Sequence, residues 1–139
     1  MKKFLIILLL PISIFSQNKL QLDSLRYYIH NNLNEYRLKY NLDTLEQIFD
    51  INTKAQYWAE KMYNENKLYH SHITDGENIM KGISIYDNLK QTSYMILQTW
   101  KESIGHNKNL LFKNYKKVGY GFYKGYAVMM FEYGIYNGI

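Results

Sequence analysis

Hydrophobic residues recur at steps of three and four along much of the chain, which predicts amphipathic helices. One such stretch covers residues 20–40, and a second covers residues 51–66, where either Asp50 or Asn52 would cap the start. A third covers residues 86–101. The positions expected to face inward are Leu22, Leu25, Tyr28, Ile29, Leu33, Tyr36 and Leu38 in the first helix, Ile51, Ala55, Trp58, Ala59 and Met62 in the second, and Leu89, Ser93, Ile96, Leu97 and Trp100 in the third.

The final part of the chain changes to a pattern that is typical of strands. The segments VGYGFY and YAVMMFEYGIY flank Lys124–Gly125, which predicts two strands joined by a tight hairpin. Earlier, residues 42–49 connect the first two helices, HSHITDGENI (residues 70–79) contains a turn at Asp75–Gly76, and a short helix begins near His106. Because the helices come first and the hairpin last, the pattern indicates an α+β fold with an antiparallel sheet.

The first residues, MKKFLIILLLPISIFSQ, have the composition of a secretory signal peptide. Two lysines precede an apolar run from Phe4 to Phe15, and Ser16 is a small residue suited to a cleavage site. The run is shorter than the roughly 20 apolar residues of a membrane span, although a retained N-terminal anchor is an alternative. We therefore predict a signal peptide over residues 1–16, one domain over residues 17–139, and a secreted or periplasmic protein with no transmembrane helix after signal removal.

Charge and cysteine content narrow the class of protein further. The 139 residues carry a formal net charge of +5, which becomes +3 once Lys2 and Lys3 leave with the signal. This mild charge is evenly spread and does not favour nucleic acid as a partner. The absence of cysteine excludes a lipid-anchored lipoprotein, disulfides, a thiol nucleophile and thiolate metal ligands. The 15 tyrosines either fill half-buried positions or form a surface suited to binding.

Side chains that bind metals or transfer protons are concentrated in and after the HSHITDGENI stretch. They are His70, His72, Asp75, Glu77, Glu102 and His106. Two imidazoles and a carboxylate are suitable ligands for zinc or a similar divalent ion; the alternative is a pair of surface histidines near a turn. The sequence contains no HExxH helix, GxSxG elbow or phosphate-binding glycine loop.

Four motifs follow one another in a fixed order. They are AQYWAEKM (55–62), KLYHS (67–71) followed by GENI (76–79), Trp-x-x-Ser-x-Gly-His-x-x-Asn-Leu-Leu (100–111) and VGYGF (118–122). The series resembles the CAP superfamily, also called SCP-like, which includes cysteine-rich secretory proteins, insect venom antigens and plant pathogenesis-related proteins. It spans essentially the whole mature chain, and the short, cysteine-free form resembles the exported bacterial branch. The resemblance implies a three-layer α-β-α sandwich with a central antiparallel sheet.

The resemblance also implies a cleft in which two histidines meet one or two glutamates. His106 matches the histidine of the Gly-His motif, and Glu77 matches the glutamate of GEN. His70 fits the Leu-x-His-Ser context of the first family histidine, with His72 as the alternative. The second family glutamate stands three residues after the tryptophan, where this chain has a serine. Glu102 is the nearest substitute, and one helical step turns its side chain by about 100°.

Other motif residues are expected to be structural. Trp58 and Trp100 should lie in the core, and Asn78 should bond the backbone of a loop after the GEN glutamate. Asn109 should do the same near the short helix. Two strand glycines, Gly119 and Gly121, should mark a bend or close packing.

Three functions are consistent with these residues. The first is a secreted or periplasmic CAP-domain protein that binds a ligand or partner, with a divalent metal such as zinc on His70 and His106. The second is a metal-dependent hydrolase of peptidase type, with Glu77 as the candidate base. The third is a structural or interaction protein of the cell envelope with no active cleft. The partner would be a small ligand, a lipid or a protein, in the envelope or outside the cell.

Overall fold

One mixed sheet organises the chain. The computed structural model describes residues 11–85 and 87–134, and only the backbone of residues 11–18. The elements are α1 (Pro11–Lys39), β1 (Glu46–Gln47), α2 (Phe49–Asn64), β2 (Gly76–Lys81), α3 (Leu89–Glu102), α4 (Ile104–Leu110), β3 (Tyr115–Tyr123) and β4 (Tyr126–Tyr133). The strand order is β1-β3-β4-β2; β3, β4 and β2 pair antiparallel, while β1 pairs parallel with β3. The α+β class is confirmed, but β1 was not predicted, because two residues carry no readable periodicity.

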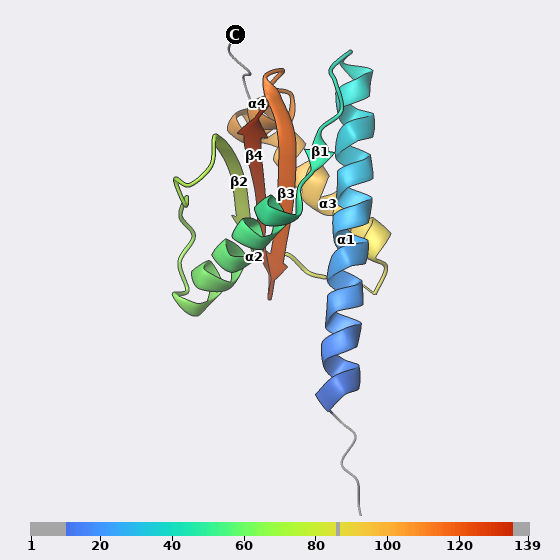
Figure 1. Cartoon of the computed structure of the whole chain (residues 1–139), viewed down its shortest axis with the longest axis vertical. Helices are drawn as coiled ribbons and strands as arrows, with labels where there is room; N and C mark the ends of the chain where they lie inside the picture. The colour runs from blue at the N-terminus through green and yellow to red at the C-terminus, as the bar shows by residue number, and fades with distance from the viewer. Residues whose placement is uncertain (1–10, 86, 135–139) are drawn as a thin grey trace, which may run out of the picture.

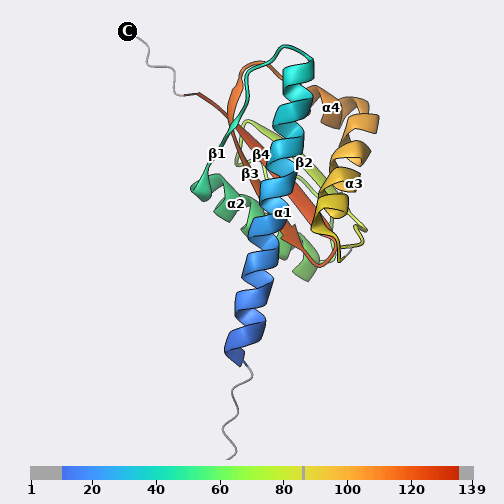
Figure 2. The ribbon, with the colours of Figure 1, turned by 90° about the vertical axis from the view of Figure 1, so that its right-hand side faces the viewer.

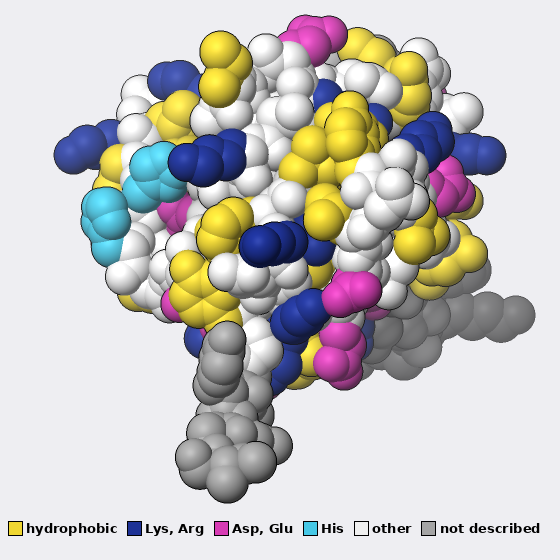
Figure 3. Space-filling model, turned by 90° about the horizontal axis from the view of Figure 1, so that it is seen from above, with side chains coloured by type: hydrophobic (Ala, Val, Ile, Leu, Met, Phe, Trp, Pro, Cys, Tyr) yellow, Lys and Arg dark blue, Asp and Glu magenta, His cyan; other side chains and the backbone are white. Residues whose placement is uncertain are grey.

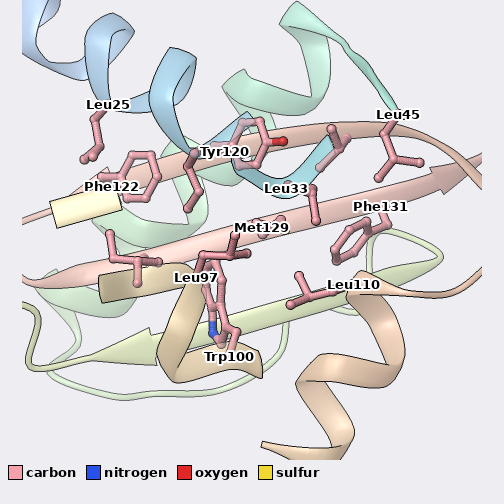
Figure 4. Close-up of a cluster of buried hydrophobic side chains, with 14 of the residues drawn as sticks. Leu25, Leu33, Leu45, Leu97, Trp100, Leu110, Tyr120, Phe122, Met129 and Phe131 are labelled. Carbon is pink, nitrogen blue, oxygen red and sulfur yellow. The ribbon is translucent and has the colours of Figure 1, made fainter. Parts of the chain in front are cut away.

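Helices cover both faces of the sheet, which gives three layers (Figures 1 and 2). The first core cluster lies between one face and helices α1, α3 and α4 (Figure 4); among its members are Leu33, Leu97, Trp100, Tyr120 and Phe131. The second cluster lies between the other face and α2; its members include Ile51, Trp58, Met62, Val128 and Met130. Side chains that alternate along β4 therefore enter different cores, as the pleat of a strand requires.

The two strand glycines allow α2 to rest directly on β3. A Cβ atom at Gly121 would lie 2.2 Å from the carbonyl carbon of Ala55, and one at Gly119 would lie 2.4 Å from the backbone nitrogen of Asn52. Any side chain at either position would therefore push α2 away from the sheet. The predicted close packing is confirmed, because the backbone of α2 occupies the space that a side chain at either position would need.

The hairpin between β3 and β4 is also confirmed. Its two turn residues, Lys124 and Gly125, have φ angles of 41° and 85°. Positive φ at both positions is typical of a type I′ turn, whose twist matches that of the flanking strands.

The starts of three helices differ from the predicted ones. Helix α1 starts at Pro11 rather than at residue 20. Helix α2 starts at Phe49, and Ile48 occupies the cap position without a side-chain cap bond, so neither Asp50 nor Asn52 caps this helix. Helix α3 starts at Leu89 rather than near residue 86, because the Asn88 side chain accepts a hydrogen bond from the backbone of the first turn.

One buried position in α1 was missed. Leu38 was expected to face the core but is exposed, whereas its neighbour Arg37 is fully buried. The Arg37 guanidinium donates to the backbone oxygens of Asp43, Leu110 and Phe112. It therefore joins α1 to the end of α4, a role that a hydrophobicity pattern cannot indicate.

The GENI segment forms strand β2 rather than part of a turn region. It pairs along its whole length with β4 at the outer edge of the sheet. Two polar residues at its centre, Glu77 and Asn78, hide the alternation that would have predicted a strand.

The predicted signal peptide lies mostly outside the described residues. Residues 1–10 are not described, and the backbone of α1 begins at Pro11 and continues past Ser16. The signal peptide and its cleavage therefore stay predictions. Among the described helices, none is both long and apolar enough to cross a membrane.

Candidate functional site

Strand β2 places a buried carboxylate beneath the loop that carries the first histidines. Glu77 is 8% exposed, and its side chain accepts three hydrogen bonds from two consecutive loop residues. Nδ1 of His70 lies 2.8 Å from Oε1, and the backbone nitrogen of Ser71 lies 3.0 Å from the same oxygen. The Ser71 hydroxyl donates to Oε2. Both carboxylate oxygens are thus occupied.

This contact fixes the orientation of the His70 ring. A carboxylate only accepts, so Nδ1 of His70 carries the proton and donates it to Glu77. In the neutral ring, Nε2 then keeps its lone pair. The His70 side chain is 50% exposed, so this nitrogen is accessible to a ligand from solvent.

Helix α4 brings the second histidine to the same region. Burial lowers the pKa of His106, and the positive charge of His70 lowers that pKa further, so the two imidazoles are close enough to interact electrostatically. His106 is half-buried beside the Trp100 ring, whose centroid lies 6.5 Å from its own. We call His70, Glu77 and His106 the His–Glu cluster. In the view of Figure 3, histidine side chains lie together on one side of the surface.

Two asparagines tie the strand to the helix. The Asn78 amide donates to the backbone oxygen of His106 at 3.1 Å. The Asn109 amide donates to the Asn78 side chain at 2.9 Å and to the backbone oxygen of Glu77 at 3.3 Å. Both residues bond backbone, but the predicted local partners are wrong: Asn78 bonds α4 and Asn109 bonds β2, so together they hold the strand and the helix in one arrangement. The positions of Glu77 and His106 are therefore coupled.

The loop before β2 is held by aromatic packing as well. The Trp58 indole nitrogen donates to the backbone oxygen of Tyr69 at 2.9 Å, and the two rings meet edge to face with centroids 4.9 Å apart. Trp58 belongs to the α2 core, so α2 positions the residue immediately before His70. Sequence reasoning missed this link and also missed Ser71 as a partner of Glu77, although serine follows the histidine in the motif.

The remaining candidate residues are exposed. His72 lies beside the cluster, with its ring centroid 6.4 Å from that of His70. Its φ angle of 58° turns the chain between the two histidines. Glu102 is exposed at the end of α3. Asp75 accepts a hydrogen bond from the backbone nitrogen of Tyr133 and so secures the end of the sheet.

The cluster can offer a cation few ligands. Across residues 11–85 and 87–134, no group of three or more His, Asp or Glu side chains is arranged to hold a metal ion. Glu77 is engaged with its own loop, which leaves two imidazoles as donors. Two imidazoles alone would make only a partial, open coordination site, with its other positions left to water or to a ligand. They do not fit a closed structural zinc site.

Comparison with known proteins shows the family and the fold of the chain. The model of the CAP family, described as the cysteine-rich secretory protein family, matches residues 30–133. An extracellular protein containing an SCP domain from Bacillus anthracis is similar in structure, with a TM-score of 0.70, 22% identity, and coverage of 81% of this chain and 41% of that one. An outer surface protein from Borrelia burgdorferi has a TM-score of 0.61 and 17% identity, with coverage of 76% of this chain and 90% of the other.

A cysteine-rich secretory protein from Staphylococcus aureus is also similar, with a TM-score of 0.57 and 17% identity over 82% of this chain and 40% of that one. The chain thus spans about two fifths of the Bacillus and Staphylococcus proteins. No curated protein matches the sequence. Because the family match covers most of the chain and the fold agrees with it, the protein belongs to the CAP family, the cysteine-rich secretory protein family.

Proposed function

We propose that this CAP-domain protein is exported and binds a ligand or partner through the His–Glu cluster, with a divalent cation such as zinc held by His70 and His106. Export is supported by the N-terminal apolar run and by the descriptions of the similar proteins, one extracellular and one on an outer surface. The similar structures share the fold at low identity, so the ligand is argued from this chain's own residues.

The observation that carries the proposal is the occupied carboxylate of Glu77. Three donors converge on it from a loop that lacks regular secondary structure. Burying a carboxylate is costly unless its hydrogen bonds are satisfied. Here those bonds orient the exposed imidazole of His70. Because an exposed ring does not stabilise the hydrophobic core, its fixed orientation is better explained by a binding role. An imidazole that binds a metal through one ring nitrogen commonly donates its other N–H to a carboxylate.

The electrostatics of His106 support the same role. Its lowered pKa keeps the ring neutral at neutral pH, and only a neutral imidazole can ligate a metal. The two imidazoles would then hold the cation, which would supply a positive charge to attract an anionic or carbonyl group of the ligand. The Asn78–Asn109 link would keep the two rings at a constant separation.

Hydrolysis with Glu77 as general base has less support than binding. A general base needs a free oxygen within reach of the proton that it removes. Both oxygens of Glu77 already accept hydrogen bonds from His70 and Ser71. A binding role requires no such free oxygen.

Calorimetric titration of the mature, metal-stripped protein with zinc tests the proposal. We expect one zinc ion to bind, and we expect the His70→Ala/His106→Ala variant to lose this binding while it keeps its circular dichroism spectrum. His72→Ala is the matched control, because it removes an exposed neighbouring histidine that the proposal does not use. Unchanged zinc affinity in the double variant would disprove the assignment, and so would an absence of binding in the wild type.

A further inference from the structure

A second candidate site lies on the opposite edge of the sheet from the His–Glu cluster. Strand β1 pairs with only two residues of β3, Lys117 and Val118. From Gly119 to Tyr123, β3 therefore has no strand neighbour on that side. A groove of about 670 Å³ lies here, lined by residues of α1 and α2 together with Gln47. Figure 1 shows α1 running beside this edge and α2 starting next to it.

Side chains that line the groove already bond the backbone of this edge of β3. The backbone nitrogen of Tyr120 donates to the Asn52 amide at 2.8 Å, and the backbone oxygen of Tyr120 accepts from Arg26 Nε at 3.0 Å. The Gln56 amide makes both bonds to Phe122, accepting from its nitrogen and donating to its oxygen, each at 3.1 Å. An extended peptide cannot add to this edge as a strand unless it displaces three side chains, so strand addition is disfavoured.

The walls of the groove present aromatic rings to solvent. Tyr27 on α1 is 61% exposed, while Phe49 and Tyr57 on α2 are 79% and 61% exposed. Large aromatic side chains around one depression form the kind of apolar surface that a soluble domain seldom leaves without a use. Each ring could cover the flat C–H face of a ligand.

The charges around the groove cancel. Two cations, Lys19 and Arg26, line it together with two anions, Asp23 and Glu60, and Arg26 forms an ion pair with Asp23. A site with no net charge gives no electrostatic preference for phosphate, sulfate or a polybasic segment. The Lys19 ammonium and the Asp23 and Glu60 carboxylates suit hydroxyl groups, which both donate and accept hydrogen bonds.

We propose that the α1–α2 groove binds a neutral oligosaccharide. Sugar rings have apolar C–H faces that stack on Tyr27, Phe49 and Tyr57, and they have hydroxyl edges that bond to the polar side chains between α1 and α2. The ligand is uncharged because the lining is neutral, and it is a chain of several sugars because aromatic rings stand on both walls. The site is separate from the His–Glu cluster and does not depend on it.

Calorimetric titration of the mature protein with chitohexaose and with cellohexaose tests the proposal. We expect at least one of these neutral hexasaccharides to bind. We also expect Phe49→Ala/Tyr57→Ala to weaken that binding by at least about tenfold, because two stacking contacts are removed. Tyr94→Ala is the matched control, since it removes a tyrosine of α3 that is 54% exposed and outside the groove. If the double variant does not fold, Tyr57→Ala alone replaces it.

The remaining outcomes are equally decisive. Binding of neither hexasaccharide would overturn the proposal, as would affinity that is unchanged in the aromatic variants. Tighter binding of a heparin-derived hexasaccharide would show that charge governs the groove, and binding of only an alternating Thr/Val peptide would assign it to strand addition. The His70→Ala/His106→Ala variant should bind the hexasaccharide as the wild type does, which separates this site from the zinc site.

Discussion

Replacement of Glu77 by glutamine tests how the first histidine is held. The glutamine oxygen would still accept from His70 and from the backbone nitrogen of Ser71, but without a charge. The new NH₂ group would face the Ser71 hydroxyl, which must turn to accept. Because the Glu77 side chain is only 5% exposed, water cannot compensate fully.

The expected change in the free energy of unfolding follows from the loss of the negative charge that strengthens the hydrogen bonds to Glu77. A hydrogen bond to a charged group contributes about 1.5–3 kcal/mol, whereas one between neutral groups contributes about 0.5–1.5 kcal/mol. Two bonds keep their geometry and lose roughly half of their strength, so we expect Glu77→Gln to lower the free energy of unfolding by about 2 kcal/mol. Ser71→Ala removes one hydroxyl donor and should cost about 1 kcal/mol.

Urea denaturation followed by tryptophan fluorescence would measure both changes. Nitrogen-15 NMR of the neutral imidazole rings would report the tautomer of His70. In the wild type the proton should reside on Nδ1, and in Glu77→Gln, whose neutral oxygen accepts more weakly, part of the population should shift toward Nε2–H. A stability change below about 0.5 kcal/mol, the range of an ordinary surface substitution, would refute the reasoning. So would an unaltered Nδ1–H signal in the variant.

Two further predictions concern packing and pH. Gly121→Ala should destabilise the fold by about 3 kcal/mol in urea denaturation, because its Cβ would lie 2.2 Å from the Ala55 backbone. A Cβ atom at Gly105 would meet nothing within 4 Å, so Gly105→Ala should stabilise α4 by up to about 1 kcal/mol. If both substitutions changed the free energy of unfolding equally, the packing argument would be contradicted. Burial lowers the pKa of His30 in the folded state below 6.5. The unfolded chain therefore binds a proton at this histidine more readily than the folded chain does. The free energy of unfolding should fall as the pH drops from about 6.5 toward the pKa of His30 in the folded state. His30→Gln should reduce this slope in thermal melts recorded between about pH 7 and pH 5, and an identical slope would contradict the assignment.

The sequence predicted the helices of the two cores well, because their packing faces are apolar and periodic. The stripe of Ile51, Ala55, Trp58 and Met62 is buried as expected. Arg37 could not be found in this way, since its burial depends on carbonyl groups that come from a loop and from the end of α4. Local periodicity indicates which residues lie on one face of a helix. It does not indicate that Arg37 has a hydrogen-bond partner 73 positions away in the sequence.

The candidate site was predictable only as a set of residues. Motif spacing selected His70, Glu77 and His106, but it did not indicate that Glu77 would be a buried strand residue. Pairing of β2 with β4 determines this, and the partner strand lies more than 50 residues later in the chain. His70 and His72 are chemically equivalent in the sequence. They differ in the structure: His70 bonds the Glu77 carboxylate, whereas His72 has a left-handed backbone and is exposed.

Strand β2 lies between the two hydrophobic cores, and the His–Glu cluster draws on both. His70 follows a tyrosine that packs on Trp58 in the α2 core, whereas His106 sits on α4, which packs in the opposite core through Leu110. A partly folded chain with only one core formed would hold one imidazole and lack the other. Occupancy of both histidines by one ligand would thus report that folding is complete. Such a ligand would protect the two layers together from local unfolding, and amide exchange in α2 and α4 would slow in parallel.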